Sequence, residues 1–193
     1  MNKKLRADAE IIARSAIEAV KPDEAVRRAL KNTALSSRVY LVAVGKAAWQ
    51  MAAAAVAELK QPLQDGIVIT KYGHAMGSIA GVRIFEAGHP VPDSNSYRAT
   101  QAVLDMTEGL TEEDTVLFLL SGGGSALFEK PLVTPELLQQ VTEVLLRGGA
   151  DITDINTIRK RLSFVKGGRF AAHCAPAKIE AVILSDVLAI RWM

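Results

Sequence analysis

Apolar residues in this chain form short continuous runs, and segments of helical periodicity separate those runs. Continuous apolar runs of this length are typical of strands that are buried on both faces of a sheet. They occupy residues 38–44, 66–70, 82–86, 115–120 and 179–184. The intervening segments predict helices at 46–59, 96–109, 135–147 and 154–162. This alternation predicts an α/β fold, with a mainly parallel sheet and helices on both faces.

The start of the chain predicts two further helices. Apolar residues recur at helical spacing from Leu5 to Val20, and Pro22 is placed to open a second, shorter helix. Asp8 and Glu10 interrupt the first segment, so it lacks the apolar core of a signal peptide. No apolar run is long enough to span a bilayer. We therefore expect a cytoplasmic protein with no membrane partner.

Composition limits the class of protein. The chain has 193 residues, of which 49% are hydrophobic and 23% are charged, as in an ordinary globular domain. Its net charge of +2 is too small to indicate a nucleic-acid partner. The single cysteine, Cys174, cannot form an internal disulfide, which suits a reducing compartment. We expect Cys174 to be a packed side chain rather than a nucleophile.

The apolar run at 115–120 leads into Ser121-Gly122-Gly123-Gly124-Ser125, the most informative segment of the chain. Consecutive glycines leave backbone N–H groups unblocked by side chains, and a helix starting behind them would add its positive dipole end. The turn can therefore bind a phosphate or a carboxylate, although a tight corner without a ligand is the alternative. Ser125 is better placed as a hydrogen-bond donor or helix cap than as an attacking group.

This glycine turn matches neither of the common nucleotide-binding motifs. Leu127 occupies the third glycine position of the dinucleotide pattern. The segment that ends in Gly45-Lys46 is not a P-loop, because Tyr40 stands where the first glycine is required. The hydrolase motif Gly-x-Ser-x-Gly is absent from the turn as well.

Two further candidates follow predicted strands at their carboxyl ends, where ligands of parallel sheets bind. Lys46 would start a helix, against the helix dipole, which indicates either a role with an anionic ligand or a surface lysine. Asp186 follows the strand at 179–184. Its carboxylate can hold Mg²⁺, can orient an attacking hydroxyl, or can merely cap the next helix.

Other polar candidates lie in a loop and on a helix. His89 begins a loop that Pro90 and Pro92 stiffen, and it either contacts substrate or has a structural role. Asn156 and Arg159 share one predicted helix, and Lys166 precedes a Gly-Gly pair. Together these three residues form either a wall that binds carboxylates or only a charged helix and turn. The histidines of the chain lack the spacing of zinc ligands.

Five parts of the chain together resemble the glycerate 2-kinase family, some members of which carry the name hydroxypyruvate reductase. They occur in the family's order and cover nearly the whole chain. The segments are Val42-Ala43-Val44-Gly45-Lys46-Ala47-Ala48, Gly88-His89-Pro90-Val91-Pro92-Asp93-Ser94, Leu120-Ser121-Gly122-Gly123-Gly124-Ser125-Ala126, Asn156-Thr157-Ile158-Arg159-Lys160 with Lys166-Gly167-Gly168-Arg169, and Ile183-Leu184-Ser185-Asp186-Val187. The resemblance implies an N-terminal Rossmann-like domain, a three-layer sandwich, followed in the family by a smaller C-terminal domain.

The resemblance also implies an activity. Members of the family transfer the terminal phosphate of ATP, with Mg²⁺, to the 2-hydroxyl of D-glycerate in a cleft between two domains. Lys46 matches the catalytic lysine, which offsets charge on the transferred group. Asp186 matches the catalytic aspartate, which accepts the substrate proton or holds the metal. Residues 121–125 match the loop that faces the ligand.

The end of the chain departs from the family pattern. The resemblance makes residues 1–187 an incomplete Rossmann-like domain, leaves 188–193 as a tail that does not fit, and leaves the C-terminal domain absent. We therefore expect little or no kinase activity from this chain alone. Apolar surface left uncovered by the truncation favours a homo-oligomer.

Two other functions remain open. One is a hydroxypyruvate reductase that uses NAD(P)H, although no Gly-x-Gly-x-x-Gly motif with a downstream acidic partner is present. The other is a non-catalytic remnant that binds small anions or a second subunit without turnover.

Overall fold

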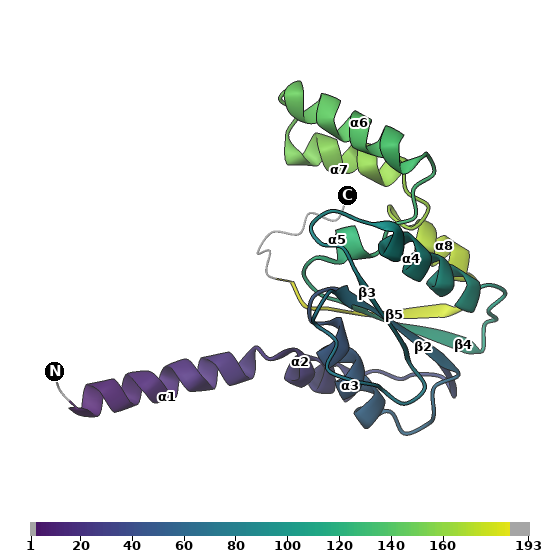
Figure 1. Cartoon of the computed structure of the whole chain (residues 1–193). Helices are drawn as coiled ribbons and strands as arrows, with labels where there is room; N and C mark the ends of the chain where they lie inside the picture. The colour runs from purple at the N-terminus through teal and green to yellow at the C-terminus, as the bar shows by residue number, and fades with distance from the viewer. Residues whose placement is uncertain (1–2, 186–193) are drawn as a thin grey trace.

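A computed structural model describes residues 3–185, and the predicted α/β fold is confirmed within that range (Figure 1). The strands are β1 (Arg38–Val44), β2 (Asp65–Lys71), β3 (Arg83–Ala87), β4 (Asp114–Leu120) and β5 (Lys178–Ile183). The helices are α1 (Lys3–Ala19), α2 (Pro22–Leu30), α3 (Ala48–Glu58), α4 (Ser94–Met106), α5 (Gly124–Leu127), α6 (Pro135–Arg147), α7 (Ile152–Arg161) and α8 (Arg169–Cys174).

The five strands form one parallel sheet in the order β3-β2-β1-β4-β5. Strand β1 is central, and its last residue, Val44, pairs with Ile69 of β2 and with Leu120 of β4. The chain runs outward from β1 to β3 and then returns to the other side of β1. Doubly wound dinucleotide-binding sheets have this order, and the reversal between β1 and β4 opens a crevice at the carboxyl ends of these strands.

Helices cover both faces of the sheet (Figure 1). Val42 and Val44 belong to the core beneath α4, α5 and α8, whereas Leu41 and Ala43 belong to the core beneath α2 and α3. These four residues of β1 are fully buried. Burial on both faces explains why the strands are continuous apolar runs rather than alternating ones.

Capping interactions explain where the helices begin. Thr134 accepts a hydrogen bond from the N–H of Leu137, so α6 starts at the predicted proline. Helix α4 starts at Ser94, earlier than predicted, because Asp93 is its N-cap and accepts a hydrogen bond from the N–H of Ser96. Helix α3 starts later than predicted, at Ala48. The N–H groups before it bind the glycine turn instead of helical carbonyls.

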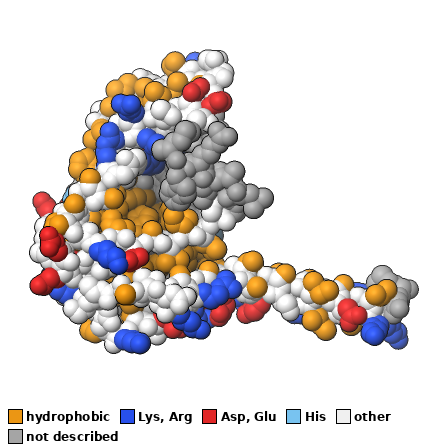
Figure 2. Space-filling model, turned by 180° about the vertical axis from the view of Figure 1, so that it is seen from behind, with side chains coloured by type: hydrophobic (Ala, Val, Ile, Leu, Met, Phe, Trp, Pro, Cys, Tyr) orange, Lys and Arg blue, Asp and Glu red, His pale blue; other side chains and the backbone are white. Residues whose placement is uncertain are grey.

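Helix α1 forms as predicted, but none of its residues is buried. It projects from the body as an arm, and hydrophobic side chains lie along that arm (Figures 1 and 2). Leu5, Ile12 and Ile17 are 65%, 68% and 62% exposed. Apolar residues at helical spacing therefore made a helix here without a covering partner among residues 3–185. In that same range, no helix combines the length and the apolar character needed to cross a membrane.

Helices α6 and α7 form a hairpin that stands apart from the sheet (Figure 1). The segments that enter and leave the hairpin bind each other. Phe164 donates a hydrogen bond to the carbonyl of Lys130 (2.7 Å), and Leu132 donates one to the carbonyl of Leu162 (2.8 Å). This short antiparallel pairing fixes the base of the hairpin to the segment that follows the glycine turn.

The contrast between core and arm gives a matched pair of substitutions. Leu117→Ala removes a fully buried side chain of β4 and should lower the free energy of unfolding by about 2–5 kcal/mol. Leu5→Ala removes an exposed side chain of α1 and should change it by less than about 0.5 kcal/mol. Urea unfolding measures both values. Equal losses from the two variants would contradict the exposed position of α1.

Candidate functional site

The loops after β1 and β4 meet at the point where the strand order reverses. The N–H of Ser121 donates to the carbonyl of Val44 (2.9 Å), and the N–H of Lys46 donates to the carbonyl of Gly122 (2.9 Å). The N–H of Ala47 donates to Ser121 Oγ (3.0 Å). These reciprocal bonds hold the glycine turn and Lys46 side by side at the crevice predicted to bind a ligand.

Gly45 makes this approach of the two loops possible. Its φ of +123° lies in the region that favours glycine. A Cβ at this position would lie 2.2 Å from Ser121 Oγ and 2.6 Å from the Ser121 carbonyl oxygen. Thr70 Oγ1 donates to the carbonyl of Gly45 (3.0 Å), which joins β2 to the same junction. No side chain larger than hydrogen fits between the two loops.

Ser121 is part of this junction. It is 5% exposed, and its hydroxyl accepts the hydrogen bond from Ala47 while lying 3.4 Å from the carbonyl of Val44. The hydroxyl therefore ties the two loops together rather than facing solvent as an attacking group. Its proposed contact with a ligand stays a prediction.

The glycine turn presents backbone donors. The N–H of Gly124 donates to the carbonyl of Ser121 (3.3 Å), whereas the N–H groups of Gly122, Gly123 and Ser125 have no hydrogen-bond partner among residues 3–185. The predicted helix behind the turn exists, but α5 has only four residues, so its dipole is small. The predicted binding of an anion here would depend on the N–H groups themselves.

Lys46 and His89 both lie close to Gly123 of the turn. A Cβ on Gly123 would lie 2.8 Å from His89 Cδ2, 2.9 Å from His89 Nε2 and 3.4 Å from Lys46 Cγ. Lys46 is exposed, and within the described range its ammonium has no hydrogen bond or ion pair. Its backbone carbonyl lies 3.0 Å from His74 Nδ1. A cation, a histidine and unpaired N–H groups thus gather at one place.

The loop that carries His89 is fixed by Asp93. This carboxylate caps α4 and also accepts a hydrogen bond from the hydroxyl of Tyr72 (2.7 Å), which in turn accepts one from Asn95 (2.7 Å). Burial would raise the pKa of Asp93, but hydrogen bonds from Ser96, Tyr72 and Gly88 lower it below its ordinary value. Sequence reasoning missed Tyr72 and Asn95, because no motif marks them.

A pocket of about 620 Å³ opens between this loop and the α6–α7 hairpin, and we call it the Pro90 pocket. Its lining comprises Pro90, Val91, Pro92, Asp93, Ser94, Tyr97, Pro135, Glu136, Leu138, Thr142, Glu143 and Arg159. Of the predicted wall residues, Arg159 lines the pocket, whereas Asn156 is exposed on α7 and does not. The structure brings Arg159 to the loop of His89.

Lys166 lies in a buried ion pair. Its ammonium contacts the Glu129 carboxylate and donates to the carbonyl of Phe128 (3.1 Å). The Glu129 side chain is 1% exposed, and burial lowers the pKa of Lys166 although Glu129 opposes that change. Sequence reasoning missed Glu129, which follows an apolar segment without a motif. The predicted contact of Lys166 with substrate stays a prediction.

Asp186 lies outside the described residues. The described end of β5 adjoins the glycine turn, since the N–H of Leu184 donates to the carbonyl of Leu120 (2.8 Å). Among the described residues, no three His, Cys, Asp or Glu side chains converge as metal ligands. Cys174 is fully buried, and burial raises the pKa of its thiol to about 11, so its predicted role as a packed side chain is confirmed.

Comparison with known proteins decides the family. The family described as a domain of unknown function, DUF4147, matches residues 8–191. The chain belongs to the DUF4147 family. A D-glycerate 2-kinase from Thermotoga maritima is 56% identical over 182 residues, which are 93% of this chain and 43% of the relative. A crystal structure of glycerate kinase from that organism has a TM-score of 0.94 and 54% identity, and covers 98% of this chain and 46% of that chain.

These findings confirm the resemblance to glycerate 2-kinases. Another relative, from Agrobacterium vitis, bears the name of a hydroxypyruvate reductase and is 42% identical over 152 residues, which are 78% of this chain and 34% of the relative. The DUF4147 chain spans less than half the length of these relatives. The family match includes residues 188–191, within the segment that did not fit the motifs.

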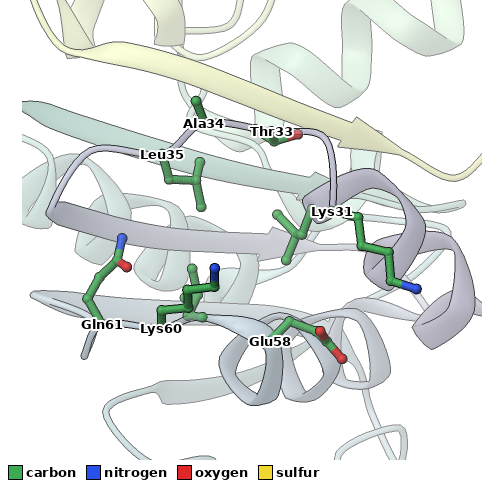
Figure 3. Close-up of a pocket in the computed structure, with 9 residues that line it drawn as sticks. Lys31, Thr33, Ala34, Leu35, Glu58, Lys60 and Gln61 are labelled. Carbon is green, nitrogen blue, oxygen red and sulfur yellow. The ribbon is translucent and has the colours of Figure 1, made fainter.

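A second pocket lies at the opposite edge of the sheet (Figure 3). It has a volume of about 440 Å³ and is lined by residues 30, 31, 33–35 and 58–61, which precede the first residues of β1 and β2. Lys31 and Lys60 belong to this lining with Glu58. Ligands of doubly wound sheets bind at the carboxyl ends of the strands, so the glycine turn is the better candidate site of this DUF4147 chain.

Gly45 provides a test of the junction. Gly45→Ala adds a left-handed strain of about 1–3 kcal/mol and a collision with Ser121, whereas Gly73→Ala adds strain alone, because nothing lies within 4 Å of its Cβ. We expect Gly45→Ala to lower the melting temperature clearly more than Gly73→Ala, which has a φ of +75°. Equal shifts in thermal unfolding would contradict the close contact of the two loops.

Proposed function

We propose that this chain is the phosphate-binding part of a glycerate 2-kinase, which transfers the terminal phosphate of ATP to the 2-hydroxyl of D-glycerate. The observation that carries the proposal is the set of unpaired N–H groups of Gly122, Gly123 and Ser125 beside Lys46. They lie where the strand order reverses, the place at which doubly wound sheets bind ligands. The names of the kinase relatives support the same reaction.

The residues of the site suit phosphoryl transfer, which depends on positioning and on stabilisation of charge. The N–H groups of Gly122 and Gly123 hold a phosphate oxygen, and the ammonium of Lys46 offsets negative charge on the transferred group. His89, against Gly123, donates a hydrogen bond to the same oxygens. Arg159 supplies a second cation from the Pro90 pocket.

Asp186 completes the proposed reaction. Its carboxylate accepts the proton of the glycerate hydroxyl, while the hydroxyl oxygen forms a bond to phosphorus and the bond from phosphorus to ADP breaks. Mg²⁺ neutralises phosphate charge when it is bound. Magnesium sites often use one or two carboxylates and take their remaining ligands from phosphates and water. Asp186, which matches the catalytic aspartate of the resembling family, would be the protein ligand of the ion.

A hydroxypyruvate reductase that uses NAD(P)H is the second candidate. The strand order, which dinucleotide-binding domains share, and the name of the Agrobacterium vitis relative favour it. Leu127 in place of the third glycine and the four residues of α5 argue against it, because the dinucleotide pattern opens a full helix. We rank the kinase first.

The compartment and the assembly of the protein are inferred from its cysteine and its exposed apolar residues. We infer a cytoplasmic protein, since its one cysteine is a buried free thiol and no described helix could cross a membrane. The exposed apolar side chains of α1 favour self-association. Because the chain spans less than half the length of its relatives, we expect it alone to turn over slowly or to bind without turnover.

Lys46→Met tests the proposed function. We expect it to weaken ATP binding in calorimetry by about tenfold, since it removes one preorganised charge. Lys31→Met, an exposed lysine at the opposite edge, is the matched control and should leave the ATP affinity unchanged.

Two results would reject the kinase assignment. One is unchanged ATP affinity in Lys46→Met. The other is consumption of NADH with hydroxypyruvate as substrate, which would establish the reductase instead.

A further inference from the structure

The Pro90 pocket is too large and too apolar to serve a three-carbon acid. Its volume of about 620 Å³ falls within the range of pockets that hold drug-sized ligands. Three prolines, Val91, Leu138 and the ring of Tyr97 supply most of its wall. Such a wall favours a flat, weakly polar group over a small hydrophilic anion such as glycerate.

The charges of the pocket exclude a free anion from its interior. Asp93, Glu136 and Glu143 are acidic residues of the lining, and Arg159 is the one cationic residue among the lining residues. In the described part of the chain, Arg159 has no hydrogen-bond or ion-pair partner. A ligand that fits this lining has a neutral body and places an anionic group only near Arg159.

One loop connects the pocket with the glycine turn. Pro90 belongs to its lining and is covalently joined to His89, whose imidazole lies against Gly123. A ligand that fills the pocket and extends past His89 reaches the unpaired N–H groups of Gly122 and Gly123 and the side chain of Lys46. A nucleotide has this form, with a flat neutral base at one end and phosphates at the other.

We propose that the Pro90 pocket binds the base and ribose of the nucleotide, and that the phosphates extend from it past His89 to the glycine turn. The proposal rests on the proposed function for the identity of the ligand as a nucleotide. Tyr97 and the prolines pack against the base, as aromatic rings do in other base-binding proteins. Arg159 pairs with the phosphate next to the ribose. The α6–α7 hairpin therefore serves as one wall of the nucleotide site.

Val91 allows a sharp test, because it is 73% exposed at the pocket and a larger residue can enter without disturbing the core. Val91→Trp should fill the space for the base and weaken ATP binding by about tenfold. The matched control is Val144→Trp. Val144 is 68% exposed on α6, and it does not line the pocket. Calorimetry with ATP and with inorganic tripolyphosphate, which has no base, compares the two variants.

The proposal predicts that Val91→Trp loses affinity for ATP alone and keeps its affinity for tripolyphosphate, while Val144→Trp keeps both. Unchanged ATP binding in Val91→Trp overturns the proposal, and so does an equal loss for both ligands. The failure of the kinase assignment is distinguishable from these results. If NADH is consumed with hydroxypyruvate but ATP binding still falls only in Val91→Trp, the nucleotide pocket stands and the reaction is different.

Discussion

The contact between Gly45 and Ser121 is the constraint on which the rest of the site depends. The loops that follow β1 and β4 approach so closely that a Cβ on Gly45 would lie 2.2 Å from Ser121 Oγ. That approach lets Lys46 and Ala47 donate backbone hydrogen bonds to residues of the glycine turn. As a result, α3 starts at Ala48 rather than at Lys46. The N–H groups of Gly122 and Gly123 have no hydrogen-bond partner among residues 3–185. The proposed anion site is thus a result of close loop packing at the centre of the sheet.

The fold could be predicted closely from the sequence, because fully buried strands leave an unambiguous pattern. Residues 38–44 were predicted with their observed bounds, because the run from Val39 to Val44 is hydrophobic on both faces of the strand. Helix starts were less exact. Whether α3 begins at Lys46 or at Ala48 depends on hydrogen bonds to a turn far away in the sequence, and local propensity carries no information about such bonds. The spacing of apolar residues likewise could not show that α1 is exposed on all sides.

The site could be predicted only in part. Lys46 and the glycine turn were predicted to share one edge of the sheet, because both follow parallel strands. The sequence placed Asn156 and Arg159 in one predicted wall. Only Arg159 lines the pocket beside the loop of His89, because the orientation of the hairpin depends on distant pairing. The burial of Glu129 could not be predicted either, because a carboxylate after an apolar segment is usually exposed. Its burial is evident only with Lys166 beside it.

The buried pair of Glu129 and Lys166 helps to position the α6–α7 hairpin next to the candidate site. An ion pair removed from water adds little net stability, because desolvation offsets the attraction of the charges. It does fix geometry, and Glu129 with Lys166 joins the segment after the glycine turn to the segment after α7. Together with the hydrogen bonds of Phe164 and Leu132, it sets where the hairpin and Arg159 stand. In this proposal the central sheet holds the N–H donors for phosphate, and the hairpin forms a wall of the neighbouring Pro90 pocket.

The most direct test of this account follows the backbone amides by nuclear magnetic resonance while ATP is added. The account predicts that the amide signals of Gly122, Gly123 and Ser125 move most, because their N–H groups gain a phosphate acceptor. Amides at the opposite edge, such as that of Lys31, should stay in place. If ATP shifts amides elsewhere while those of the glycine turn do not move, the turn does not bind phosphate and the central claim fails.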